Sequence, residues 1–114
     1  MTGCVLRIKG KDLEVPSSLE VIATFDEGAN INVSEADGDE FEKQKKEAID
    51  FLQAQSEALK TLTDQKGFLS ASLDFGVYAE EMWSKSYAFQ PQLAALAAQH
   101  QLELMVSVYA AEDT

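Results

Sequence analysis

The chain has 114 residues, of which 46% are hydrophobic and 25% charged, a composition typical of a globular protein with a real core. Twenty acidic residues against nine basic ones give a formal net charge of −11, which argues against nucleic acid and anionic membranes as partners. No apolar run is long enough to span a bilayer, and we expect residues 1–114 to form a single domain.

The first segment predicts a half-buried strand. Cys4, Leu6 and Ile8 alternate with Arg7 and Lys9, so the apolar side chains share one face and the cations share the other. The only cysteine lies on the apolar face, where a buried and inert thiol is expected. No secretory signal precedes it, and one cysteine fits a reducing compartment, so we expect a cytoplasmic protein.

A hairpin and then a long helix are predicted next. Residues 19–25 are apolar and partly β-branched, residues 26–30 favour a turn, and Ile31 and Val33 alternate with polar neighbours. The helix is expected at about 37–66, with Asp37 and Glu40 as a capping box, Ser34 with Asp37 as a competing start, and Lys66-Gly67 as its end. Its apolar stripe, in which Gln55 fills a gap, comprises Phe41, Ala48, Ile49, Leu52, Leu59 and Leu62.

The second half predicts a strand, a short helix and a last strand. Residues 69–77 alternate between large apolar and small or polar side chains. Pro91 suits the first position of a helix over about 91–100. Residues 102–109 alternate again, and 110–114 are expected to fray.

This order predicts an α+β fold. We expect a two-layer sandwich in which both helices cover one face of a single sheet of four to five strands, mostly antiparallel or mixed.

The C-terminal half resembles a group of small bacterial proteins without an established activity. The resemblance is carried by LDFGVY at 73–78, FQPQL at 89–93, LEL at 102–104 and SVY at 107–109, with the opening TGCVLRIKG at 2–10. In that group an L-D-F-G-V strand precedes a proline-containing helix start and an L-E-L last strand ending in S-x-Y. The resemblance implies a bacterial, soluble and non-enzymatic protein and brings no known active site.

Three motifs invite a chemical interpretation that their surroundings do not support. Asp74-Phe75-Gly76 matches the magnesium-binding tripeptide of protein kinases, but the chain has no Gly-rich loop or catalytic loop. Residues 37–48 lack the glycine and the final glutamate of a calcium loop. His100 is the only histidine and is expected to face the last helix carbonyls as a cation or donor. The sequence therefore predicts no catalytic residue, no cofactor and no metal site.

The connection 78–89 is the strongest candidate for binding a partner. It holds the only tryptophan, aromatic neighbours and paired carboxylates, and such side chains anchor many protein interfaces. Packing of these aromatic rings over the end of the core is the competing interpretation. The candidate partner-binding residues are Tyr78, Glu80, Glu81, Trp83 and Tyr87.

The leading hypothesis is a non-enzymatic protein that binds a macromolecular partner with a basic surface. One version is an immunity-type protein that blocks a cationic toxin, with Asp39, Glu40, Glu80 and Glu81 steering the encounter. The alternative is a small enzyme or small-ligand binder whose site lies between the sheet and the 78–89 connection. Its converging side chains would be Asp74, Tyr78, Glu81 and His100. A homodimer formed through an edge strand or the long helix is the third interpretation.

Overall fold

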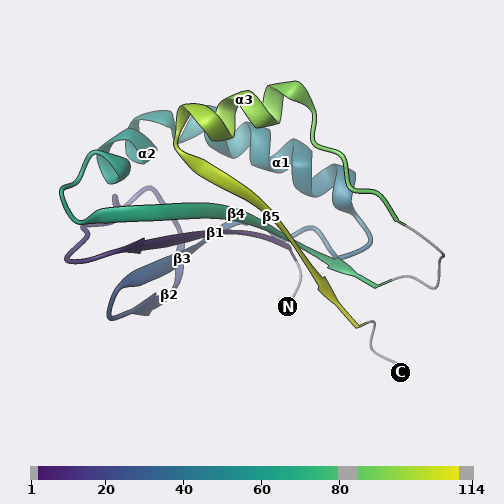
Figure 1. The fold of residues 1–114 in the computed structure, drawn as a ribbon, viewed down its shortest axis with the longest axis horizontal. Coiled ribbons are helices and arrows are strands. Elements are labelled where there is room, and N and C mark those ends of the chain that lie inside the picture. The colour runs from purple at the N-terminus through teal and green to yellow at the C-terminus, as the bar shows by residue number, and fades with distance from the viewer. Residues whose placement is uncertain (1–2, 80–84, 111–114) are drawn as a thin grey trace.

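The computed structural model describes residues 3–79 and 85–110 and contains five strands and three helices (Figure 1). The strands are β1 (Gly3–Gly10), β2 (Val21–Phe25), β3 (Gly28–Ser34), β4 (Phe68–Tyr78) and β5 (Leu102–Tyr109). The helices are α1 (Phe41–Ala54), α2 (Ser56–Thr63) and α3 (Pro91–Gln99). None of these helices has the length and apolar character needed to cross a membrane.

The strands form one mixed sheet in the order β2-β3-β1-β4-β5, and the three helices lie on one face of it (Figure 1). β1 pairs antiparallel with β3 and β4, and β2 pairs antiparallel with β3. β4 and β5 are parallel, because the connection through α3 returns the chain to the end of the sheet where β4 begins. The predicted α+β fold, with helices on one face of a five-stranded mixed sheet, is therefore confirmed.

The long helix predicted over 37–66 is two helices that meet at Gln55. Gln55 has φ −104° and ψ 19°, which ends α1 and starts α2. Its side-chain amide donates a hydrogen bond to the carbonyl of Ser18 at 3.4 Å instead of continuing the apolar stripe. Leu59 and Leu62, which follow this break, are buried in the core.

The helix also begins later than the capping-box pattern predicts. α1 starts at Phe41, and Glu40 is its N-cap residue. The carboxylate of Glu40 accepts a hydrogen bond from the backbone N–H of Asp37 at 3.1 Å, so one half of the box is formed. The carboxylate of Asp37 instead accepts from the N–H of Gly38 at 2.8 Å. Asp37 therefore stabilises a turn that precedes the helix.

The core lies between the helices and the covered face of the sheet. Leu52 and Leu59, the centre of the predicted stripe, are fully buried. The other buried members include Cys4, Leu6, Ile8, Ile31, Ala48, Leu62, Leu73, Phe75 and Leu93. The stripe predicted from the spacing of apolar residues is thus the face that α1 and α2 turn toward the sheet.

A β-bulge shifts the start of β4. Lys9 pairs with Ser70, but Gly10 pairs with Phe68, so Leu69 has no partner on β1. Phe68 consequently packs against the core and Leu69 is 73% exposed, which reverses the predicted alternation at these two positions only. The later members of the apolar set, Ala71, Leu73, Phe75 and Val77, are buried as the alternation predicts. Gly67, next to the bulge, does not have the positive φ expected of a helix C-terminal glycine. Glycine is required there because a Cβ would lie 1.9 Å from the carbonyl oxygen of Lys11.

Candidate functional site

The predicted partner-binding connection is only partly within the described residues. Glu80, Glu81 and Trp83 lie outside them. Tyr78 is half-buried, and its hydroxyl donates a hydrogen bond of 2.7 Å to the carboxylate of Asp37. Tyr87 is also half-buried and packs edge-on against the core. Both described tyrosines therefore have contacts within the protein, as the competing interpretation of this segment predicts.

Tyr87 belongs to an aromatic cluster at the end of the core. The ring of Phe41 contacts the rings of Tyr87, Phe75 and Phe89 edge-on, at centroid distances of 5.1, 5.7 and 5.8 Å. Lys45, which is buried, places its ammonium group 4.7 Å from the centroid of the Phe41 ring. The same group donates to the carbonyl of Ala88 at 2.7 Å and pairs with Glu42 at 2.9 Å. These contacts tie the residues before α3 to the first turns of α1.

Two of the side chains proposed for a small enzyme, Asp74 and His100, lie on opposite faces of the sheet, and Glu81 lies outside the described residues. Asp74 is only 4% exposed and lies on the face that no helix covers. Its two oxygens accept hydrogen bonds from Nε of Arg7 at 2.9 Å and from the hydroxyl of Ser107 at 2.6 Å. His100 is the C-cap residue of α3, in the helix layer. Asp74 thus links three strands rather than converging with His100.

His100 and Cys4 are both buried groups whose protonation burial alters. Burial lowers the pKa of His100, so its imidazole is neutral at pH 7, which leaves the donor and not the cation of the two predicted alternatives. Its Nε2 atom has no hydrogen-bond partner within the described part of the chain. Burial, with a smaller contribution from the charge of Asp74, raises the pKa of the Cys4 thiol far above its usual range. Cys4 is therefore the inert thiol that the sequence predicts.

Gln44 is a fully buried polar residue for which the apolar pattern gives no signal. Its amide nitrogen lies 2.9 Å from the carbonyl oxygen of Asp37, 2.9 Å from that of Gly76 and 3.1 Å from that of Ala36. These bonds fasten α1 both to the segment that follows β3 and to β4. They fix one wall of the groove described next.

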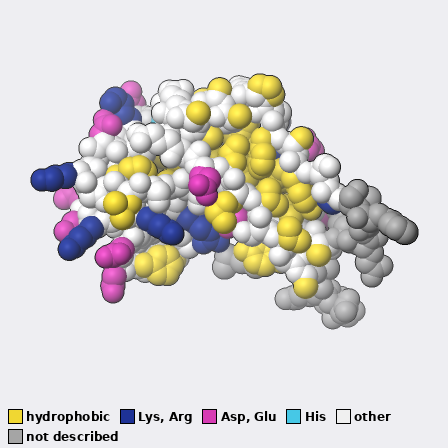
Figure 2. All heavy atoms as spheres, viewed as in Figure 1, with side chains coloured by type: hydrophobic (Ala, Val, Ile, Leu, Met, Phe, Trp, Pro, Cys, Tyr) yellow, Lys and Arg dark blue, Asp and Glu magenta, His cyan; other side chains and the backbone are white. Residues whose placement is uncertain are grey.

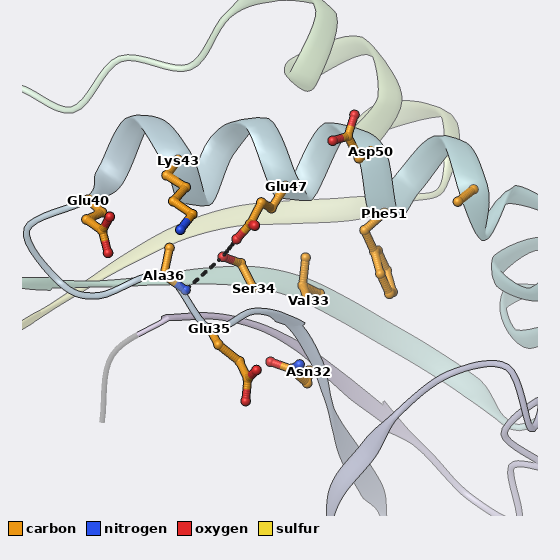
Figure 3. A pocket seen from close by; sticks show the side chains of 11 residues that line it. Asn32, Val33, Ser34, Glu35, Ala36, Glu40, Lys43, Glu47, Asp50 and Phe51 are labelled. Atoms are coloured by element: carbon orange, nitrogen blue, oxygen red, sulfur yellow. Dashed lines mark hydrogen bonds between the residues drawn. The ribbon is translucent and has the colours of Figure 1, made fainter.

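A groove of about 670 Å³ runs between α1 and the end of β3 (Figure 3). We call it the acidic groove. Lys43, Glu47 and Phe51 reach from α1 toward the segment 33–36 that forms the other wall. The described residues that line it are Asn32, Val33, Ser34, Glu35, Ala36, Glu40, Lys43, Glu47, Asp50, Phe51 and Ala54.

The acidic groove combines an apolar wall with a net charge of −3, from four carboxylates and one ammonium group. The hydroxyl of buried Ser34 donates to the carboxylate of Glu47 at 2.6 Å and accepts from the N–H of Ala36 at 3.1 Å (Figure 3). Glu47 is therefore held in place, whereas Glu35 and Asp50 are exposed on the rims. Across residues 3–79 and 85–110, no group of three or more His, Cys, Asp or Glu side chains is placed to hold a metal ion.

The sequence contains a signal for this groove that the search for chemical motifs missed. Glu40, Lys43, Glu47 and Asp50 recur at steps of three and four, the spacing of one face of a helix. The apolar pattern assigns most of these residues to a solvated face. It does not predict that a second chain segment runs opposite them, because the path of the segment after β3 depends on Ser34 and Gln44.

A second hollow, of about 500 Å³, lies on the uncovered face of the sheet and shares residues 32, 34 and 35 with the acidic groove. Three of its polar side chains already have partners within the protein. Arg7 is bonded to Asp74, and the side-chain amide of Asn32 donates to Glu20 at 3.2 Å. This hollow therefore offers fewer groups to a ligand than the acidic groove does.

Comparison with known proteins gives no match to the chain, whether with models of protein families, with curated proteins or with solved structures. The resemblance in residues 73–109 to a group of bacterial proteins accordingly stays a prediction.

Proposed function

We propose that this chain is a non-enzymatic protein that binds a basic protein partner through the acidic groove. The observation that carries the proposal is the lining of the groove, in which carboxylates flank the apolar side chains of Val33 and Phe51. A lysine or arginine side chain matches such a surface, because its aliphatic part packs on apolar atoms while its charged head meets carboxylates. The partner would therefore present basic and apolar side chains on one segment.

The charge of the whole chain supports the same class of partner. A net charge of −11 attracts a cationic protein and raises the rate of encounter, and it repels acidic competitors. Glu40 lines the groove and exposed Asp39 lies beside it, so two of the four predicted steering residues belong to this region. An immunity-type protein that neutralises a cationic toxin is the specific form of the proposal that fits the resemblance to bacterial proteins.

The experiment compares two baits with equal charge. The groove variant Glu35→Lys/Asp50→Lys reverses the charge of two exposed residues on the rims of the groove. Neither side chain forms a hydrogen bond within the described residues. Glu27→Lys/Glu57→Lys reverses two exposed residues outside the groove and serves as the control. Proteins from the source cell that bind the wild type and the control but not the groove variant are purified, and binding is then remeasured with the pure components.

The expected partner is a basic protein whose affinity falls as salt rises. Lys43→Ala, which removes the one cation among the described residues that line the groove, is expected to strengthen that binding. The proposal is overturned if the same proteins bind all baits equally, or if the purified partner is acidic. Adjacency of the encoding gene to a toxin gene, with protection lost in the groove variant, would support the immunity-type form.

A further inference from the structure

The surface formed by α3 and β5 differs in charge from the rest of the chain. Residues 91–109 contain one of the 20 acidic residues, Glu103, and none of the nine basic ones. Apolar side chains gather on this side of the molecule, over α3 and β5 (Figure 2). The exposed large apolar side chains of β5 are Val108, which is 57% exposed and lies on the face that the helices cover in part, and Met105, which lies on the opposite face. We call residues 91–109 the α3–β5 surface.

β5 is also an open edge of the sheet, since it pairs only with β4 among the described strands. The carbonyl of Tyr109 accepts a hydrogen bond from the N–H of Ala79, beside β4, and the β4–β5 register has no shift. Backbone groups of alternate residues point to opposite sides of a strand. Those of residues 103, 105, 107 and 109 therefore face β4, and those of 104, 106 and 108 point outward, ready to pair with another strand.

α3 covers only the first half of β5. The helix has nine residues and a length of about 13 Å, whereas the strand has eight residues and a length of about 26 Å. The helix ends where the strand begins, so it lies over the start of the strand. Exposure follows this arrangement, because Leu102 is 8% exposed, Leu104 and Val106 are half-buried and Val108 is exposed.

We propose that β5 pairs with β5 of a second copy of this chain, antiparallel and across a two-fold axis at Val106. In this register Val106 faces its own copy and Leu104 faces Val108. Each α3 then lies opposite the uncovered half of the partner's strand, so the two helices do not collide. Val108 is buried beside the second copy's Leu104, and the two sheets join into one continuous sheet.

Charge selects a second copy as the occupant rather than a basic partner. Two molecules with a charge of −11 repel each other, so they associate best through the surface with the fewest charges. In the proposed register Glu103 faces Tyr109, so the only charged residue of the strand does not meet its own copy. A basic partner would find no carboxylate on this surface except Glu103. The dimer and the acidic groove use different surfaces, so either can fail without the other.

The first test measures self-association of the full chain by sedimentation over a range of concentrations. Val108→Lys changes an exposed position on β5 and is expected to weaken dimerisation by about tenfold or more, because a charge replaces an apolar contact twice in the dimer. The control is Ile22→Lys, which makes the same change of charge at an exposed position of β2. It is expected to dimerise at least as well as the wild type, because the added lysine lowers the net negative charge of each chain by one and so weakens the repulsion between the two chains.

The second test measures the register by disulfide cross-linking with diamide. Val106→Cys places two thiols at opposite positions whose Cα atoms are about 5.5 Å apart, within the range of a disulfide. Val108→Cys is more exposed, but its two copies would be about 13 Å apart along the strands. Only Val106→Cys is expected to form a linked dimer, and buried Cys4 does not compete in either variant.

Three outcomes would overturn the proposal. The wild-type chain could remain a monomer at submillimolar concentration. Val108→Lys could dimerise as strongly as Ile22→Lys, which would place the interface elsewhere. Val108→Cys could cross-link as fast as Val106→Cys, which would exclude this register. Circular dichroism of each variant shows whether it is folded. If Val108→Lys is not folded, Val108→Thr replaces it, and this variant is expected to weaken the dimer less, because it adds a polar group without a charge.

Discussion

The two ends of the sheet differ in regularity and charge. At one end β2 has five residues, and its pairing with β3 shifts between Val21 and Ala23. At the other end β5 has eight residues in an unbroken register with β4. Acidic residues Glu20, Asp26 and Glu27 flank β2, whereas β5 contains only Glu103. We refer to β2 with β3 as the β2 end and to α3 with β5 as the β5 end.

This difference indicates that the two edges are under different constraints. Natural sheets protect their edges from unwanted pairing by short strands, bulges and nearby charges, and β2 has all three. β5 is longer, has no shift in its register with β4 and contains a single charged residue, Glu103, and its Val, Leu and Met side chains favour strand addition. An edge of that kind is a hazard unless it has a partner. The β2 end, which adjoins the acidic groove through β3, remains available for a different protein.

The largest expected difference between the two ends is in the stability lost when one side-chain hydrogen-bonding residue on the uncovered face is replaced by alanine. Asp74→Ala leaves Arg7 and Ser107 without their shared acceptor at a site that is 4% exposed, and we expect a loss of stability of about 1–3 kcal/mol. Asn32→Ala removes an exposed bond to Glu20 and is expected to change stability by less than about 0.5 kcal/mol. Urea unfolding at low protein concentration measures both values.

Asp74→Asn is the matched control, because it removes the negative charge but keeps the shape of the side chain and one acceptor oxygen. It should lose less stability than Asp74→Ala. Equal losses for Asp74→Ala and Asn32→Ala would show that the three-strand link through Asp74 does not stabilise the β5 end more than the Glu20 bond stabilises the β2 end.

Much of the fold follows from simple periodicity. The alternation in residues 4–8 and the apolar stripe through Leu52 and Leu59 predict side chains that are buried in the structure. The alternation in 102–109 is followed only in part, because Leu102 is buried, Leu104 and Val106 are half-buried and Val108 is exposed. Pro91 correctly marks the first turn of α3. These features depend on local spacing and on burial of apolar side chains, which a sequence displays directly.

The features that the sequence does not predict depend on polar groups that meet across the fold. Gln44 and Lys45 look like surface residues of a helix, but both are buried because carbonyl groups of distant segments accept their hydrogen bonds. The division of the helix at Gln55 depends on the carbonyl of Ser18, and the bulge at Leu69 depends on the register with β1. None of these partners is adjacent in sequence.

The candidate site shows the same limit. Glu40 was identified as an acidic residue near a helix start, but its place in a groove with Glu47 and Phe51 requires the path of residues 33–36. The composition of the connection 78–89 predicts a partner-binding segment. Its described members Tyr78 and Tyr87, however, have intramolecular contacts. Composition predicts a basic partner, which stays a prediction, and it does not indicate that a groove lies between α1 and residues 33–36.

His100 gives the β5 end a response to pH that the β2 end, without a histidine, lacks. Burial lowers its pKa in the folded state, so below the ordinary value of about 6.5 the unfolded chain binds a proton that the folded chain does not. The stabilisation by neutral His100 is complete above that value and is lost as pH falls. His100→Gln should therefore reduce the loss of stability between about pH 7.5 and 5.5, measured by urea unfolding. An unchanged slope would contradict this assignment.

The smallest expected effects, and the ones that separate the two ends most directly, are responses to salt. Dimerisation through the α3–β5 surface brings together two chains of charge −11 without forming ion pairs, so screening of their repulsion should strengthen it several-fold. Binding of a basic partner in the acidic groove depends on attraction between opposite charges, and the same screening should weaken it. Sedimentation of the chain alone and binding of the purified partner, measured at low and moderate sodium chloride, test the two signs. If both interactions weaken with salt, the dimer contains ion pairs that the α3–β5 surface does not offer, and its interface must lie on the charged part of the molecule.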